Sequence, residues 1–198
     1  MASTSSWRSR AFVVAFLVLV GALLVPVATA SVETFHRFEI DAIANYTLTQ
    51  TCADGSTVTT RVQVIAGHED EAGSGVTTID HDFLTVRIFG FDCAGFVNDF
   101  GTGDAEFTFS PSLQTAAVTG TVTTRNGRSV AVDMAWEGTG PIEVTDNVTI
   151  FEGFTGHFHG QVRDAVATGT VLVNGATLVD GSTTNARLET LEDTNIRH

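Results

Sequence analysis

The chain has 198 residues and is acidic, with 23 Asp and Glu residues against ten basic ones and a formal net charge of −13. A field of that sign repels phosphate backbones and anionic lipid surfaces, which argues against a nucleic-acid-binding protein. The sequence also lacks the usual motifs of a serine nucleophile, a zinc protease, a P-loop and a dinucleotide site.

The first predicted element is a secretory signal peptide over residues 1–30. Arg8 and Arg10 precede an uncharged, largely apolar stretch over residues 11–30, which ends in Ala28-Thr29-Ala30. A basic start, an apolar core and small residues at the cleavage point are what export and cleavage require. An uncleaved anchor is the alternative, since about twenty apolar residues can span a bilayer. Cleavage after Ala30 would leave residues 31–198 as one extracellular domain without a membrane span.

Alternation with a period of two predicts β-strands through the rest of the chain. Apolar side chains occupy every second position at Phe38, Ile40, Ala42, Ala44, Tyr46 and Leu48. Asp54-Gly55 then indicates a turn, and the alternation resumes over residues 58–64. Residues 84–91 are apolar on both faces, which is typical of an inner strand.

The second half predicts two hairpins of similar design. Asn126-Gly127 and Asn174-Gly175 each stand between alternating runs, and Asn-Gly is a strong signal for a tight β-turn. Residues 67–77 and 94–103 contain glycine and acidic residues, so we interpret them as surface loops. The fold class that follows is all-β, a single antiparallel β-sandwich or β-barrel of about nine or ten strands.

Three side chains carry structural predictions of their own. Cys52 and Cys93 are the two cysteines of the chain, and an isolated pair in an exported protein predicts one disulfide. Trp136 continues the series Val130, Val132 and Met134, so we expect it to be buried.

A short segment around Trp136 resembles a group of uncharacterised secreted bacterial proteins. Residues 136–141 read Trp-Glu-Gly-Thr-Gly-Pro and match their W-x-G-T-G-P segment, and residues 160–169 match a later G-x-V-x-x-A-x-A-x-G stretch. The resemblance covers about residues 115–190. It implies an all-β extracellular domain without an assigned activity, and it transfers no functional residue.

One constellation could carry chemistry. His157 and His159 are two residues apart, so on a strand both imidazoles point to the same face, an arrangement that can hold a divalent transition metal. His81, between Asp80 and Asp82, is the candidate third ligand, with a neighbouring Asp as the alternative. The alternative is that both histidines simply face solvent.

These observations favour a secreted or cell-surface binding module that is not an enzyme and that recognises an extracellular ligand or protein. The alternative is a metal-dependent enzyme or a small-molecule-binding barrel that uses the His157/His159 pair. The sequence leaves open which ligand is bound and whether the domain is catalytic.

Overall fold

A computed structural model describes residues 33–73, 78–151 and 153–197, and this part of the chain is built from strands without a helix. The predicted leader and its cleavage point lie outside the described residues. The strands are β1 (Glu33–Thr51), β2 (Thr57–Gly73), β3 (Ile79–Asp92), β4 (Gly95–Phe109), β5 (Thr115–Thr123), β6 (Ser129–Gly138), β7 (Glu143–Phe151), β8 (Phe154–Val173) and β9 (Ala176–Arg197). Over the same described ranges, no helix is long and apolar enough to cross a membrane.

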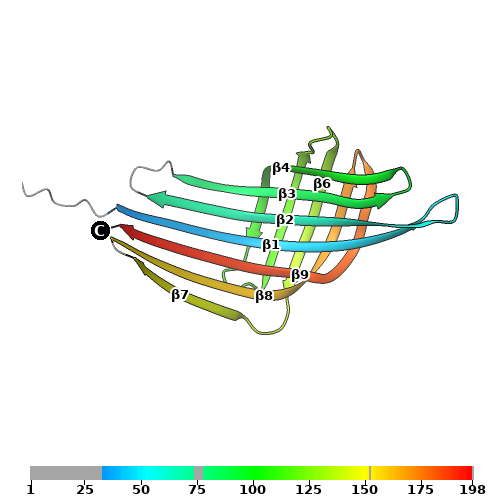
Figure 1. Ribbon diagram of the computed structural model, residues 1–198. Helices are drawn as coiled ribbons and strands as arrows, with labels where there is room; N and C mark the ends of the chain where they lie inside the picture. Colours follow the sequence, from blue (N-terminus) through cyan, green and yellow to red (C-terminus); the bar gives the residue numbers. More distant parts are fainter. Residues whose placement is uncertain (1–32, 74–77, 152, 198) are drawn as a thin grey trace, which may run out of the picture. The chain divides into compact units, whose positions relative to one another are not determined.

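Eight of the strands close into an antiparallel barrel, which confirms the all-β prediction. Their order is β6-β5-β4-β3-β2-β1-β9-β8, and a second pairing between β6 and β8 closes the ring. In Figure 1, β6 crosses behind β1 and β2 at a steep angle. The ninth strand, β7, pairs with the first half of β8 and lies outside the closed ring.

The barrel interior is filled with side chains, as expected for a ring of eight strands. Within the predicted inward series of β1, the side chains from Ile40 to Tyr46 are buried, whereas Phe38 and Leu48 at its ends are partly buried. Val62, Val64, Leu84 and Val86 meet this series from β2 and β3. Trp136 is 2% exposed, which confirms its predicted burial, and its Nε1 donates a hydrogen bond to the carbonyl of Ile43 at 3.0 Å. The indole thus connects β6 to β1, which are not neighbours in the sheet.

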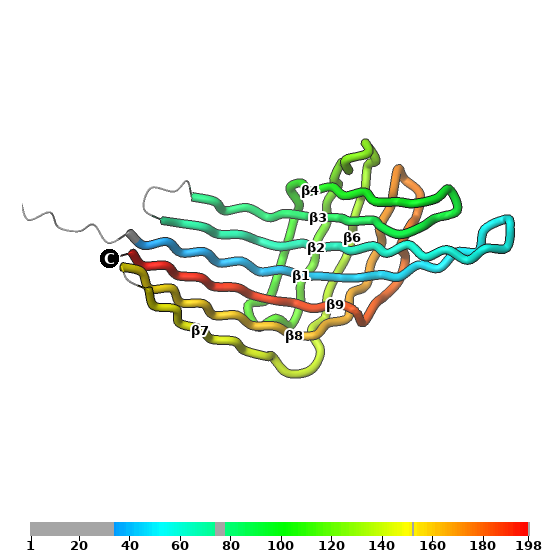
Figure 2. The backbone as a smooth tube through the Cα atoms, in the orientation of Figure 1, coloured from blue at the N-terminus to red at the C-terminus, as the bar shows by residue number. Residues whose placement is uncertain are grey.

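Several strands are too long for the barrel, and their ends continue as an open sheet that we call the ledge. Figure 2 shows β1, β2, β8 and β9 running unbroken from the barrel into this sheet. β8 changes partner on the way, from β7 at Val162 to β6 at Ala165, and a bulge follows between Ala165 and Ala167. The ledge consists of residues 33–41, 67–73, 79–83, 143–151, 154–162 and 189–197.

The turns and the disulfide agree in part with their predictions. The Cys52–Cys93 disulfide is present, with the two Cα atoms 5.5 Å apart, and it joins the β1–β2 turn to the β3–β4 turn. Asn174 and Gly175 both have positive φ, as the tight hairpin requires. At the β5–β6 turn only Gly127 of the Asn-Gly pair is among the described residues with positive φ, so the loop is of another type.

The two predicted loops are largely strand in the described residues, and residues 74–77 of the first lie outside them. Residues 67–73 continue β2, and residues 95–103 belong to β4. Glycine and acidic side chains suggested loops, but Gly67 and Gly101 lie where a neighbouring part of the chain approaches their backbone closely. A Cβ on Gly101 would lie 2.8 Å from the carbonyl oxygen of Thr123.

Candidate ligand groove

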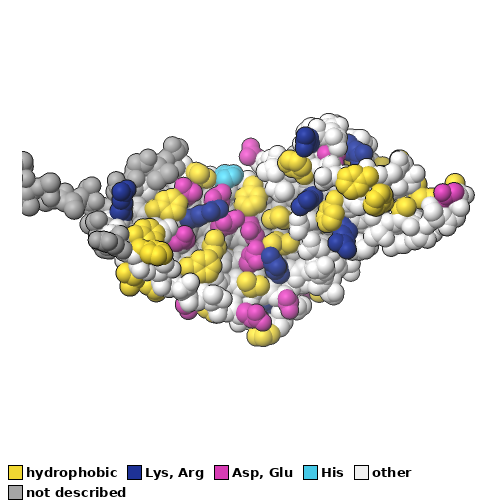
Figure 3. Space-filling view, in the orientation of Figure 1, with side chains coloured by type: hydrophobic (Ala, Val, Ile, Leu, Met, Phe, Trp, Pro, Cys, Tyr) yellow, Lys and Arg dark blue, Asp and Glu magenta, His cyan; other side chains and the backbone are white. Residues whose placement is uncertain are grey.

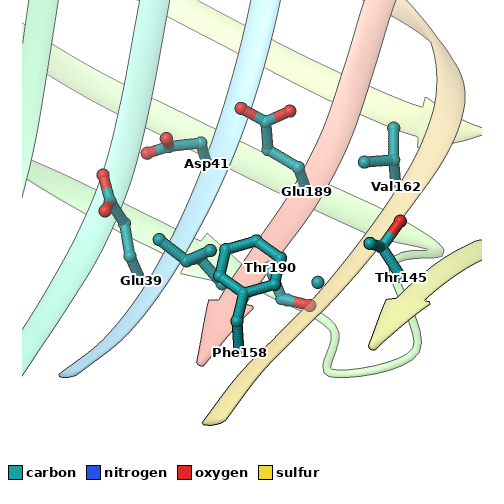
Figure 4. Close-up of a pocket in the computed structure, with 9 residues that line it drawn as sticks. Glu39, Asp41, Thr145, Phe158, Val162, Glu189 and Thr190 are labelled. Carbon is teal, nitrogen blue, oxygen red and sulfur yellow. The ribbon is translucent and has the colours of Figure 1, made fainter. Parts of the chain in front are cut away.

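The outer face of the ledge carries a groove with a volume of about 440 Å³. Figure 4 shows its carboxylates on one side and its apolar side chains on the other. The same face is seen in Figure 3, where acidic and hydrophobic side chains lie side by side. The groove is lined by Glu39, Asp41, Thr145, Phe158, Gly160, Val162, Glu189, Thr190 and Leu191.

Strand register brings three carboxylates together at one side of the groove. Glu39 and Asp41 are two residues apart on β1 and therefore share a face. Asp41 stands directly opposite Glu189 of β9 in the antiparallel pair. Like charges in opposite positions destabilise a sheet, so this cluster lowers the stability of the folded protein.

Arginines compensate two of these carboxylates. Arg37 forms ion pairs with Glu39 at 2.8 Å and with Glu69 at 2.9 Å, and Arg187 forms one with Glu189 at 2.8 Å. Asp41 differs, because its Oδ1 is buried and has no hydrogen-bond partner. It lies against Gly67 of β2, where a Cβ would collide with that oxygen.

The environment of Asp41 favours its neutral form. Burial first, and then the charges of Glu39 and Glu189, raise the pKa of Asp41 to about 7, while Arg37 acts in the opposite direction. A carboxyl group with such a pKa exchanges its proton near neutral pH. A bound cation would favour the ionised form, so the groove can couple cation binding to proton release.

The other side of the groove is apolar. Phe158, Val162 and Leu191 form it, and Phe158 is 38% exposed. Gly160 makes room for the ring, since a Cβ there would lie 3.2 Å from Cε1 of Phe158. An apolar surface beside a cluster of carboxyl groups suits a ligand that has a cationic end and an apolar body.

The raised pKa gives a stability test of the site. In the unfolded chain Asp41 ionises near 3.8, whereas in the folded chain it holds its proton until about pH 7. The folded state therefore binds more protons between these values, and this contribution to the unfolding free energy falls as pH rises through the window. We expect the unfolding free energy of Asp41→Asn to rise relative to that of wild type from pH 4 to pH 7. Above pH 7 the difference between the two proteins should stay constant. Thermal denaturation across this range measures it.

Asp133→Asn is the matched control for that experiment, because Asp133 is an exposed carboxylate on β6, outside the groove. We expect its stability to follow the wild-type curve at a constant offset. A constant offset for Asp41→Asn as well would show that Asp41 titrates normally.

A second pocket of about 440 Å³ lies at one mouth of the barrel, lined by residues that include Leu48, Asp92 and Arg128. Its charged groups already have partners. Arg128 lies 3.7 Å from the fully buried carboxylate of Asp99, and Asp92 accepts a hydrogen bond from the amide of Ala94. The ledge groove, with its unpartnered carboxylate oxygen, is therefore the stronger candidate.

The predicted metal ligands are only partly brought together. His157 and His159 lie on the same face of β8, and His159 contacts Asp146 of β7 and Gln161. His81 is on β3, and the register places it on the opposite face of the ledge. Within the described ranges no group of three His, Cys, Asp or Glu side chains is arranged to hold a metal ion. A transition-metal site on the histidine pair stays a prediction, and His81 is not positioned to complete it.

Comparisons with family models, with curated proteins and with solved structures each find no match to this chain.

Proposed function

We propose that this protein is an exported binding module, without catalysis, whose ledge groove captures a ligand that has a cationic group on an apolar body. The observation that carries the proposal is Asp41, a carboxylate with an unpartnered oxygen, in the same groove as the apolar side chains Phe158, Val162 and Leu191. The predicted leader and the disulfide are compatible with a role outside the cell.

The net negative charge of the protein also favours a cationic ligand, and it acts at long range. Loss of Arg8 and Arg10 with the leader would leave eight basic against 23 acidic residues, a net charge of −15. A negative field steers cations toward the molecule. At short range, an ammonium or guanidinium group at Asp41 would relieve the repulsion among the three carboxylates. The same group would give the Asp41 carboxylate a charged hydrogen-bond donor.

Binding of a defined probe tests the proposal. We expect 2-phenylethylamine to bind the exported protein, because its ring can pack on Phe158 while its ammonium group reaches Asp41. Backbone amide shifts in NMR spectra should change at residues 39–41, 158–162 and 189–191. Affinity should rise between pH 6 and pH 8, since the cation prefers the ionised form of an Asp41 whose pKa is about 7.

Three compounds and two variants complete the design. Ethylamine lacks the apolar body, 2-phenylethanol lacks the charge and 3-phenylpropionate reverses it, so each should bind more weakly. Asp41→Asn should weaken the amine about tenfold or more, as expected for a hydrogen bond to a charged group, whereas Asp133→Asn should not. Equal binding of the alcohol and the amine, or an unaffected Asp41→Asn, would refute the proposal.

A further inference from the structure

The outer edge of β7 is exposed along its whole length. β7 pairs with β8 on one side, and no other described strand pairs with it. All nine of its residues, Glu143–Phe151, are exposed. Such an edge presents a row of backbone N–H and C=O groups ready to pair with another strand.

The two edges of the ledge differ in how they are protected. The edge formed by the first residues of β3 carries Asp80, His81 and Asp82, and charged side chains are a common guard against edge pairing. β7 contains no proline, and its pairing with β8 runs without a bulge. Val144, Val148 and Ile150 share one face of β7 and are 55%, 54% and 74% exposed. The β7 edge is thus regular, and it exposes three apolar side chains on one face beside the carboxylates of Glu143 and Asp146.

We infer that β7 pairs antiparallel with β7 of a second copy of this chain, joining two ledges into one continuous sheet. In the register that pairs all nine residues, Val144 faces Ile150 of the second copy. Asp146 faces Val148, and Glu143 faces Phe151. In this register no carboxylate faces another. In each copy, Asp146 keeps its contact with His159 of the same chain. Sliding the strands by two residues in one direction would set Asp146 against Asp146, which is unfavourable. Sliding them by two residues in the other direction would leave Glu143 without a partner on the second β7 and would pair fewer residues.

A two-fold pairing through β7 gives a closed dimer rather than an open chain of molecules. A two-fold pairing uses the same surface on both copies, so it consumes both β7 edges and closes. The edges that remain are the charged β3 edges. A head-to-tail pairing of β7 with β3 would instead continue into a fibre, and the charges on β3 oppose it.

Cysteine cross-linking tests the pairing and its register together. In the full-overlap register Asn147 faces Asn147 of the second copy, with Cβ atoms about 5 Å apart. Thr145 faces Thr149, which leaves the two Thr145 side chains roughly 13 Å apart along the strand. We expect Asn147→Cys to form a disulfide-linked dimer under mild oxidation, with Cys52–Cys93 intact. The matched Thr145→Cys should not. Efficient linking through Thr145→Cys, or none through Asn147→Cys, would overturn this pairing.

The mass in solution provides the second readout. Light scattering should give twice the chain mass for the exported protein, and Ile150→Lys should weaken the dimer at least about tenfold. Phe96→Lys is the matched control, because Phe96 is 70% exposed near the start of β4, a strand that does not pair with β7. A monomer at all concentrations, or a dimer that Ile150→Lys leaves intact, would overturn the inference.

Discussion

Replacing Trp136 with alanine should lower the unfolding free energy by about 3–5 kcal/mol, the usual cost of deleting a large buried aromatic side chain. The indole is 2% exposed, and it donates to the carbonyl of Ile43 across the barrel. Its loss would leave a void and an unpaired buried carbonyl between β6 and β1. Urea denaturation of the two proteins followed by circular dichroism measures the difference.

The Trp136→Phe variant separates the contribution of packing from that of the hydrogen bond. Phenylalanine keeps most of the buried volume but cannot donate, so we expect a smaller loss that includes about 1 kcal/mol for the hydrogen bond. If both variants lost the same amount, packing around the indole would not be the main source of its contribution.

Removing the disulfide with Cys52→Ser and Cys93→Ser should cost about 4 kcal/mol in the chain-entropy model, because the bridge closes a loop of 41 residues. For a domain of this size the melting temperature should fall by roughly 10 °C. The bond joins two turns at the same end of neighbouring hairpins, β1–β2 and β3–β4. Differential scanning calorimetry checks the shift.

Ala53→Ser with Ala94→Ser is a suitable control, because both alanines are exposed and each adjoins one of the cysteines. It should melt close to wild type. Reduction and alkylation of the wild-type protein should reproduce the loss seen for the serine variant. An unchanged melting temperature after reduction would mean that the hairpins alone hold the two turns together.

Local patterns predicted much of the fold. The alternation from Phe38 to Leu48 marks one face of β1, and burial of Ile40, Ala42, Ala44 and Tyr46 follows it. Residues 67–73 and 95–103 were misjudged, because glycine and acidic residues are as typical of loops as of strands in close contact. What makes them strands is pairing with β1 and β3, and a single sequence does not show which strands are neighbours.

The groove was harder to foresee for the same reason. Glu39 and Asp41 read as the polar face of a long strand. Only the register between β1 and β9 places Glu189 opposite Asp41, and those residues are far apart in the sequence. The histidine pair was visible because its two members are neighbours on one strand. In the sequence, the groove is marked by two acidic residues at alternate positions. These two residues do not indicate which distant part of the chain lies beside them.

Asp41 combines a cost in stability with a candidate role in binding. Its substitution by asparagine should stabilise the protein at neutral pH and weaken amine binding at the same time. Sites that bind ligands often retain such unfavourable groups, because relief of the repulsion is supplied by the ligand. A variant that lost stability and binding together would instead point to general disruption of the ledge.

The pairing of β1 with β9 also has a consequence for how the protein forms during synthesis. Glu33 lies opposite Arg197, so the two ends of the described chain meet in the middle strands of the ledge. A ribosome releases the start of the chain long before its end, and contacts between such distant segments form late. Hairpins such as β1–β2 and β3–β4 can assemble while the rest is still being made. The groove, which takes residues from β1, β7, β8 and β9, can exist only after the last strand has emerged.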